Sequence, residues 1–153
     1  MNQEISESDW EEIKEIAAEI ANAAISEDSI FVESLRLKLL DKLASLEEKY
    51  GEHASLLGVI AEYIEMPDEK MSLFNRAYEI AEKQKDYLNL TLVSHSIAEL
   101  YILEFKDEQN GARWLDKLES NLKTHYSSFE AEHLLALKVD LEKLRNPSFL
   151  EPQ

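Results

Sequence analysis

The chain has 153 residues, of which 44 % are apolar and 31 % are charged, so it is long and apolar enough to build a folded core. Its 32 acids and 16 bases leave a net charge of −16, which argues against nucleic acid as a partner because phosphate binding needs a basic footprint. The absence of cysteine excludes disulfides, zinc–thiolate sites and thiol catalysis.

The start of the chain is acidic and lacks the basic and apolar segments of a secretion signal. No apolar run approaches the roughly 18 residues that a membrane-spanning helix needs. We therefore expect a cytoplasmic protein that does not associate with a membrane.

The scarcity of glycine and proline, three of each, predicts an all-α protein. A first helix is expected to begin at Ser8, which forms a capping box with Glu11. Residues 26–29 form a turn, and a second helix then runs to Tyr50 with Gly51 as its stop.

A third helix is predicted over residues 52–65. It is followed by Pro67, which is disfavoured within a helix but suits the first turn of a fourth helix. The fourth helix runs to about residue 83. A fifth helix is predicted over residues 86–105, and its dense apolar content predicts burial on more than one side.

Residues 106–111 are predicted to form a turn before a sixth helix, whose apolar stripe contains Trp114, Leu115, Leu118 and Leu122. A second capping box, from Ser127 to Glu130, opens a seventh helix that stops before Asn146. Short turns predict antiparallel neighbours. We expect one all-helical domain over residues 1–146 and a loose tail over residues 147–153.

The sequence also shows self-similarity at an interval of 40 residues. The pair Leu57-Gly58 aligns with Ile97-Ala98 in one direction and with Ala17-Ala18 in the other, so the second position is always small. An aromatic residue follows 17 positions after the first residue of the pair in two copies, namely Phe74 and Trp114.

This pattern resembles the tetratricopeptide repeat family, which pairs two helices per repeat. The matching residues are Leu57, Gly58, Phe74 and Ala77 in one copy and Ile97, Ala98, Tyr101 and Trp114 in the next, with Ala18 at the small position of the first. The resemblance is best over residues 54–117. It departs from the family in its interval of 40 residues in place of about 34, and in having Ala54 and Ser94 at the family's tryptophan position.

The resemblance implies an array of helical hairpins, closed by the seventh helix, whose concave face holds a peptide or a partner's surface. It gives a physical reason for Gly58, a close approach of two helix axes that a larger side chain would force apart. Phe74 and Trp114 would then fill the groove between the helices.

No set of residues indicates chemistry, so we predict no enzyme, no catalytic residue, no metal and no cofactor. Glu130 and His133 have the Glu-x-x-His spacing of di-iron helical proteins, but the second copy of that motif is absent and a solvated face is expected. His95 lies on an apolar helix and is expected to be packed or interfacial. Three scattered glycines form no phosphate loop.

The charge is concentrated at the start of the chain, where residues 1–34 hold ten acids and one base, a net charge of −9. Ordinary solvated helix faces would explain this, and so would a surface that steers a basic protein partner. The expected partner-binding residues are Glu7, Asp9, Trp10, Glu11, Glu12, Glu15 and Glu19. For Trp10, a core position or a hydrophobic staple is the alternative interpretation.

The most specific hypothesis is an immunity protein that neutralises a cognate toxin, because the chain resembles such small, acidic, cysteine-free proteins. A nuclease-type toxin has to be basic to hold nucleic acid, so an acidic inhibitor fits its cleft. The alternative is a tetratricopeptide-like chaperone or scaffold that holds an extended segment of a secreted partner. A third hypothesis, a regulatory domain that self-associates, would need an exposed apolar stripe, for which residues 86–105 are the best candidate.

Overall fold

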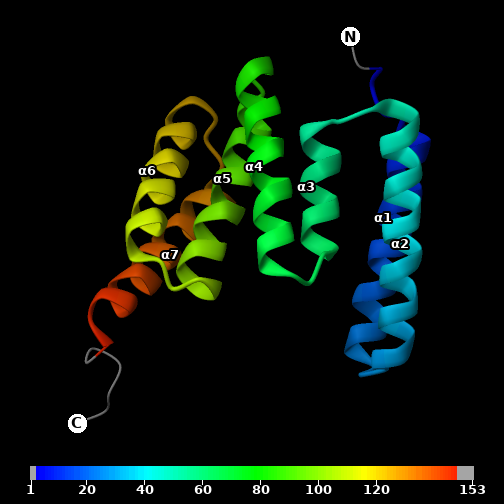
Figure 1. Cartoon of the computed structure of the whole chain (residues 1–153), viewed down its shortest axis with the longest axis horizontal. Coiled ribbons are helices and arrows are strands. Elements are labelled where there is room, and N and C mark those ends of the chain that lie inside the picture. Colours follow the sequence, from blue (N-terminus) through cyan, green and yellow to red (C-terminus); the bar gives the residue numbers. More distant parts are fainter. Residues whose placement is uncertain (1–2, 148–153) are drawn as a thin grey trace. The chain divides into compact units, whose positions relative to one another are not determined.

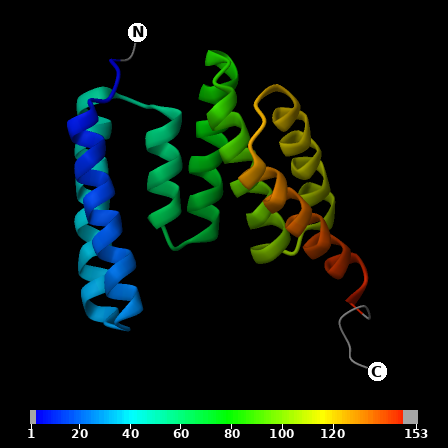
Figure 2. The ribbon, with the colours of Figure 1, turned by 180° about the vertical axis from the view of Figure 1, so that it is seen from behind.

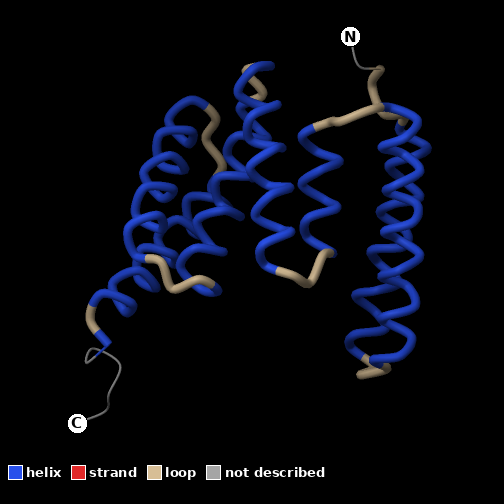
Figure 3. Tube along the Cα trace, viewed as in Figure 1, coloured by secondary structure: helices blue, strands red, loops and turns tan. Residues whose placement is uncertain are grey.

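The computed structural model describes residues 3–147, and this part of the chain is all-α with no strand, which confirms the predicted fold class (Figures 1 and 3). It contains seven α-helices and one π-helical turn, which are α1 Glu7–Ile25, α2 Ser29–Tyr50, α3 Ala54–Tyr63, α4 Pro67–Gln84, α5 Tyr87–Glu99, η1 Leu100–Glu104, α6 Glu108–Thr124 and α7 Ser128–Arg145.

The chain divides into two compact units, Met1–Tyr63 and Ile64–Gln153. The expectation of a single domain over residues 1–146 stays a prediction. Residues 148–153 of the expected loose tail lie outside the described residues.

The first unit is built on an antiparallel pair of long helices, α1 and α2, with the shorter α3 packed on α2 (Figures 1 and 2). Apolar residues at three- and four-residue spacing face each other across this pair, as an amphipathic pattern predicts. The core of the unit contains Ile13, Ile16, Leu39, Leu43, Leu46, Tyr50 and Leu56.

The ends of α1 and α2 follow local capping rules. The start predicted at Ser8 is wrong, because Ser6 has the extended backbone of an N-cap and its hydroxyl accepts a hydrogen bond from the Asp9 backbone N–H at 3.1 Å. The stop predicted at Gly51 is confirmed, and its φ of 82° is a conformation that glycine adopts without strain. The third helix is shorter than the predicted 52–65.

The second unit has α5 at its centre, where it contacts α4, α6 and α7. Consecutive helices run antiparallel, as the short turns predict (Figures 1 and 2). The predicted helix start at Pro67 is confirmed, and so is the cap at Ser127, whose hydroxyl accepts from the Glu130 backbone N–H at 3.3 Å. The predicted burial of the fifth helix is observed along α5.

The positions that carry the repeat pattern differ in burial. Phe74, Ala77, Ala98 and Trp114 are buried, and Tyr101 is half-buried. Ala18 is exposed, so it does not share their packing role. Within the first unit, a Cβ on Gly58 would meet no heavy atom within 4 Å, so the close approach predicted there stays a prediction.

A close approach is found at Gly111, inside the second unit. The predicted turn over 106–111 is wrong in its second half, because α6 begins at Glu108 and Gly111 lies in its first turn. The single helix predicted over 86–105 also changes to a π-helical turn at Leu100. This turn carries Ile102, whose Cγ1 would lie 2.7 Å from a Cβ on Gly111.

Candidate functional site

The acidic residues of α1 divide into a solvent-facing group and a group that faces α2. Residues four apart share one side of a helix, so Glu7, Glu11, Glu15 and Glu19 form a stripe along α1, hereafter the acidic stripe. All four are exposed. Glu11 pairs with Lys14 at 3.2 Å, whereas the other three have no ion-pair partner among the described residues.

Asp9 and Glu12 are paired with residues of α2, although Glu12 is itself exposed. The Asp9 carboxylate accepts hydrogen bonds from the Tyr50 hydroxyl at 2.5 Å and from Lys49 at 3.2 Å. The Tyr50 hydrogen bond and then that of Lys49 lower the pKa of Asp9 to about 2, against the opposing effect of burial. Glu12 pairs with Lys42 at 2.6 Å. These contacts join α1 to α2. They explain the presence of Asp9 and Glu12 without a role in binding another protein.

Trp10 lies beside the acidic stripe, in a groove between α1 and α3. The groove has a volume of about 580 Å³. Its apolar lining consists of Trp10, Ile13, Ala17, Val59 and Tyr63, and its two charged lining residues are Lys14 and Glu62. Both walls pack on α2, so the groove belongs entirely to the first unit.

The far end of the groove is fixed by Arg36 of α2. Its guanidinium donates a hydrogen bond to the backbone carbonyl of Tyr63 at 2.8 Å and another to Glu33 at 2.9 Å. A cation at the C-terminus of a helix satisfies carbonyls that have no partner within the helix. Arg36 therefore holds the last turn of α3, and with it Tyr63, against α2.

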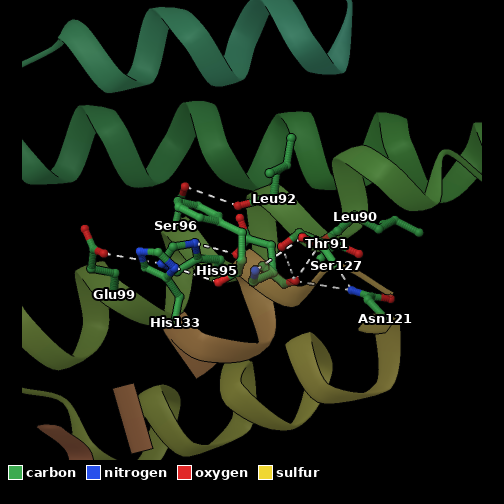
Figure 4. A network of polar contacts seen from close by, with 12 residues as sticks. Leu90, Thr91, Leu92, His95, Ser96, Glu99, Asn121, Ser127 and His133 are labelled. Atoms are coloured by element: carbon green, nitrogen blue, oxygen red, sulfur yellow. Dashed lines mark hydrogen bonds and ion pairs between the residues drawn. The ribbon is translucent and has the colours of Figure 1, made fainter. Parts of the chain in front are cut away.

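A separate polar cluster lies in the second unit, around His95 of α5 (Figure 4). Its Nδ1 lies 2.8 Å from the Glu130 carboxylate on α7, and its Nε2 lies 3.4 Å from the Glu99 carboxylate. Burial disfavours the charged imidazole, but Glu99 and Glu130 outweigh this effect and raise the pKa of His95. The His133 ring is 5.0 Å from the His95 ring, between centroids.

The His95 cluster corrects the expectation for Glu130, which is 3 % exposed and not part of a solvated face. His133 is partly exposed, and its Nδ1 donates to the Phe129 carbonyl of its own helix at 2.8 Å. Within residues 3–147 no three histidine or acidic side chains are placed to hold a metal ion. The contact between His95 and Glu130 links α5 to α7.

Sequence reasoning identified Trp10 and the acidic stripe but missed the other wall of the groove. Val59, Glu62 and Tyr63 lie more than 40 residues further along the chain, and nothing in their local pattern indicates which helix they face. The pairing of His95 with Glu130 was missed for the same reason.

The comparisons with known proteins show no relationship to another protein. The chain matches no family model, and no curated protein or solved structure is significantly similar to it. The described part of the chain contains no helix with both the length and the apolar character needed to cross a membrane.

Proposed function

We propose that this protein is a non-enzymatic binding module that captures a basic protein partner through the acidic stripe of α1. The supporting observation is that the four glutamates of this stripe are exposed and follow one another at four-residue spacing. Glutamates four residues apart on a helix destabilise it by about 0.2–0.5 kcal/mol per pair. Only Glu11 has a nearby cation, Lys14, among the described residues. A basic partner supplies the missing opposite charge and is steered toward the stripe.

The most specific form of the proposal is an immunity protein for a nuclease-type toxin. Such a toxin carries a basic cleft for nucleic acid, and an acidic helix laid along that cleft excludes the substrate. The first unit carries 15 acids and 5 bases, and the second carries 17 acids and 11 bases. The excess of acid in the shorter unit supports α1 as the side that meets the partner.

Affinity capture from the native cell tests this proposal. The bait is the full chain, its Glu7→Gln/Glu15→Gln/Glu19→Gln variant, and a control variant that neutralises three exposed acids of the second unit, Glu82, Glu104 and Glu132. We expect one basic protein to be retained by the wild type and the control at low salt, and to be retained more weakly by the stripe variant.

The captured protein is then assayed for nuclease activity with and without the wild-type chain. Loss of activity on binding supports the immunity role, whereas an extended or unfolded captured segment supports the chaperone alternative. Equal capture by all three baits, or capture of acidic proteins, would contradict a role for the acidic stripe.

A further inference from the structure

We propose that the groove between α1 and α3 takes the apolar face of a basic amphipathic helix presented by the partner. This inference rests on the proposed function, because the same partner contacts the acidic stripe. It adds a second and different contact, which is apolar, and it names the structure of the segment that binds.

The lining of the groove indicates an apolar occupant. Trp10 is half-buried, and Val59 and Tyr63 are half-buried on the opposite wall. Ala17 lies between larger residues on α1, and its small side chain keeps the groove open. A half-buried tryptophan in an apolar recess is typical of residues that anchor protein interfaces.

The shape of the groove indicates a helix. Its two walls are helices that both pack on α2, and such a groove accepts the apolar face of a further helix in the manner of a helical bundle. Its volume of about 580 Å³ is large enough for more than one side chain. Residues three or four apart on the incoming helix would enter it together.

The charge around the groove selects a basic helix. Successive residues of a helix turn by about 100°, so Glu7 and Glu11 lie on the flank of α1 next to Trp10. Lys14 is the single base of the lining, and it is already paired with Glu11. Lysines or arginines that flank an apolar stripe would therefore meet the acidic stripe while the apolar residues enter the groove.

Titration with synthetic peptides tests the inference with the full chain. The probe is an 18-residue peptide of lysine and leucine whose leucines recur at helical spacing. The control peptide has the same composition in an order that forms no apolar face. Trp10 is the reporter, because the other tryptophan, Trp114, is 5 % exposed and lies in the second unit.

We expect the amphipathic peptide to bind at least tenfold more tightly than its scrambled control and to shift Trp10 emission to the blue. We expect Ala17→Phe, which fills the groove, to weaken binding at least tenfold with little change in its salt dependence. The Glu7→Gln/Glu15→Gln/Glu19→Gln variant should instead flatten the salt dependence and keep the emission shift at saturation.

The outcomes separate the two proposals. If the stripe variant weakens binding while the two peptides bind equally and Ala17→Phe has no effect, the groove inference is wrong and the acidic stripe alone binds. If the amphipathic peptide is preferred but the stripe variant binds as the wild type does, the groove binds and the proposed steering role fails. The comparison of the two peptides needs no variant, so it holds even if Ala17→Phe does not fold.

Discussion

Gly111 lies where a side chain has no room, against the π-helical turn that carries Ile102. A Cβ would come within 2.7 Å of the Ile102 Cγ1, and Ile102 is a stiff β-branched residue that is 2 % exposed. We therefore expect Gly111→Ala to lower the free energy of unfolding by about 1–3 kcal/mol through overpacking. Urea denaturation of the variant and the wild type measures this change.

The same substitution in an Ile102→Ala background provides the control. Removing the isoleucine side chain makes room for the new methyl group, so Gly111→Ala should cost much less there. An equal loss in both backgrounds would mean that the contact with Ile102 is not the cause.

Gly58, unlike Gly111, has room for a side chain, so we expect the opposite effect of an alanine there on stability. It lies inside α3, and a Cβ would meet no heavy atom within 4 Å. We expect Gly58→Ala to raise the free energy of unfolding by up to about 1 kcal/mol, because alanine is the better helix former. Urea denaturation measures this change. A loss of stability would instead support the close helix approach that the repeat pattern predicts at Gly58.

These two glycines show what a single sequence can and cannot establish. The periodicity of the sequence predicts that residues near Gly58 are helical, and acids and serines predict several helix starts. Helix formation and helix capping can be predicted because each depends on neighbours along the chain. The contact between Gly111 and Ile102 depends on how α6 packs against η1. No local pattern carries that information, so the sequence did not predict the close approach at Gly111.

Asp9 joins two elements, α1 and α2, through Tyr50 and Lys49. Because folding lowers its pKa to about 2, its stabilising effect is fully present above the ordinary aspartate pKa and is lost as the pH falls toward 2. We expect Asp9→Asn to lower the melting temperature at neutral pH, and the difference to shrink as the pH falls below about 4. Thermal unfolding across this range measures it.

Glu15→Gln is the matched control for Asp9→Asn, because Glu15 is exposed on the same helix and has no ion-pair partner among the described residues. This variant should not lose stability at neutral pH, because it removes only like-charge repulsion along the acidic stripe. If it reproduced the profile of Asp9→Asn, the effect would belong to net charge and not to the link between α1 and α2.

His95 joins α5 to α7 through Glu130, and we expect this contact to depend on pH. The groups that face it are Glu99 on its own helix and Glu130 and His133 on α7, while Lys70 of α4 acts on Glu99. Folding raises the pKa of His95, so its stabilising effect is fully present below the ordinary histidine pKa and is lost as the pH rises through the raised value.

We expect His95→Gln to destabilise the protein in mildly acidic solution and to have a smaller effect above about pH 8. Hydrogen exchange in α7, measured at both pH values, should show the same trend. His125→Gln is the control, because His125 lies outside the cluster. A loss of stability that was equal at all pH values would assign His95 a packing role only.

Over the whole molecule, the formal charge of −16 opposes the compact state. The first unit carries a net charge of −10 and the second a net charge of −6, so repulsion is concentrated in the shorter unit. Salt screens such repulsion. We expect the free energy of unfolding to increase between about 20 mM and about 300 mM NaCl, as measured by urea denaturation.

The acidic stripe should account for part of this salt effect. Glu7→Gln/Glu15→Gln/Glu19→Gln removes three like-charge pairs along α1, each unfavourable by about 0.2–0.5 kcal/mol, but also the favourable charge of Glu7 in the first turn, so the variant should be more stable by up to about 1 kcal/mol at low salt. It should also gain less from added salt. A stripe that lowers the stability of its own helix is consistent with selection for binding. If the variant were instead less stable than the wild type, the acids would serve the fold, and the argument for a basic partner would lose its support.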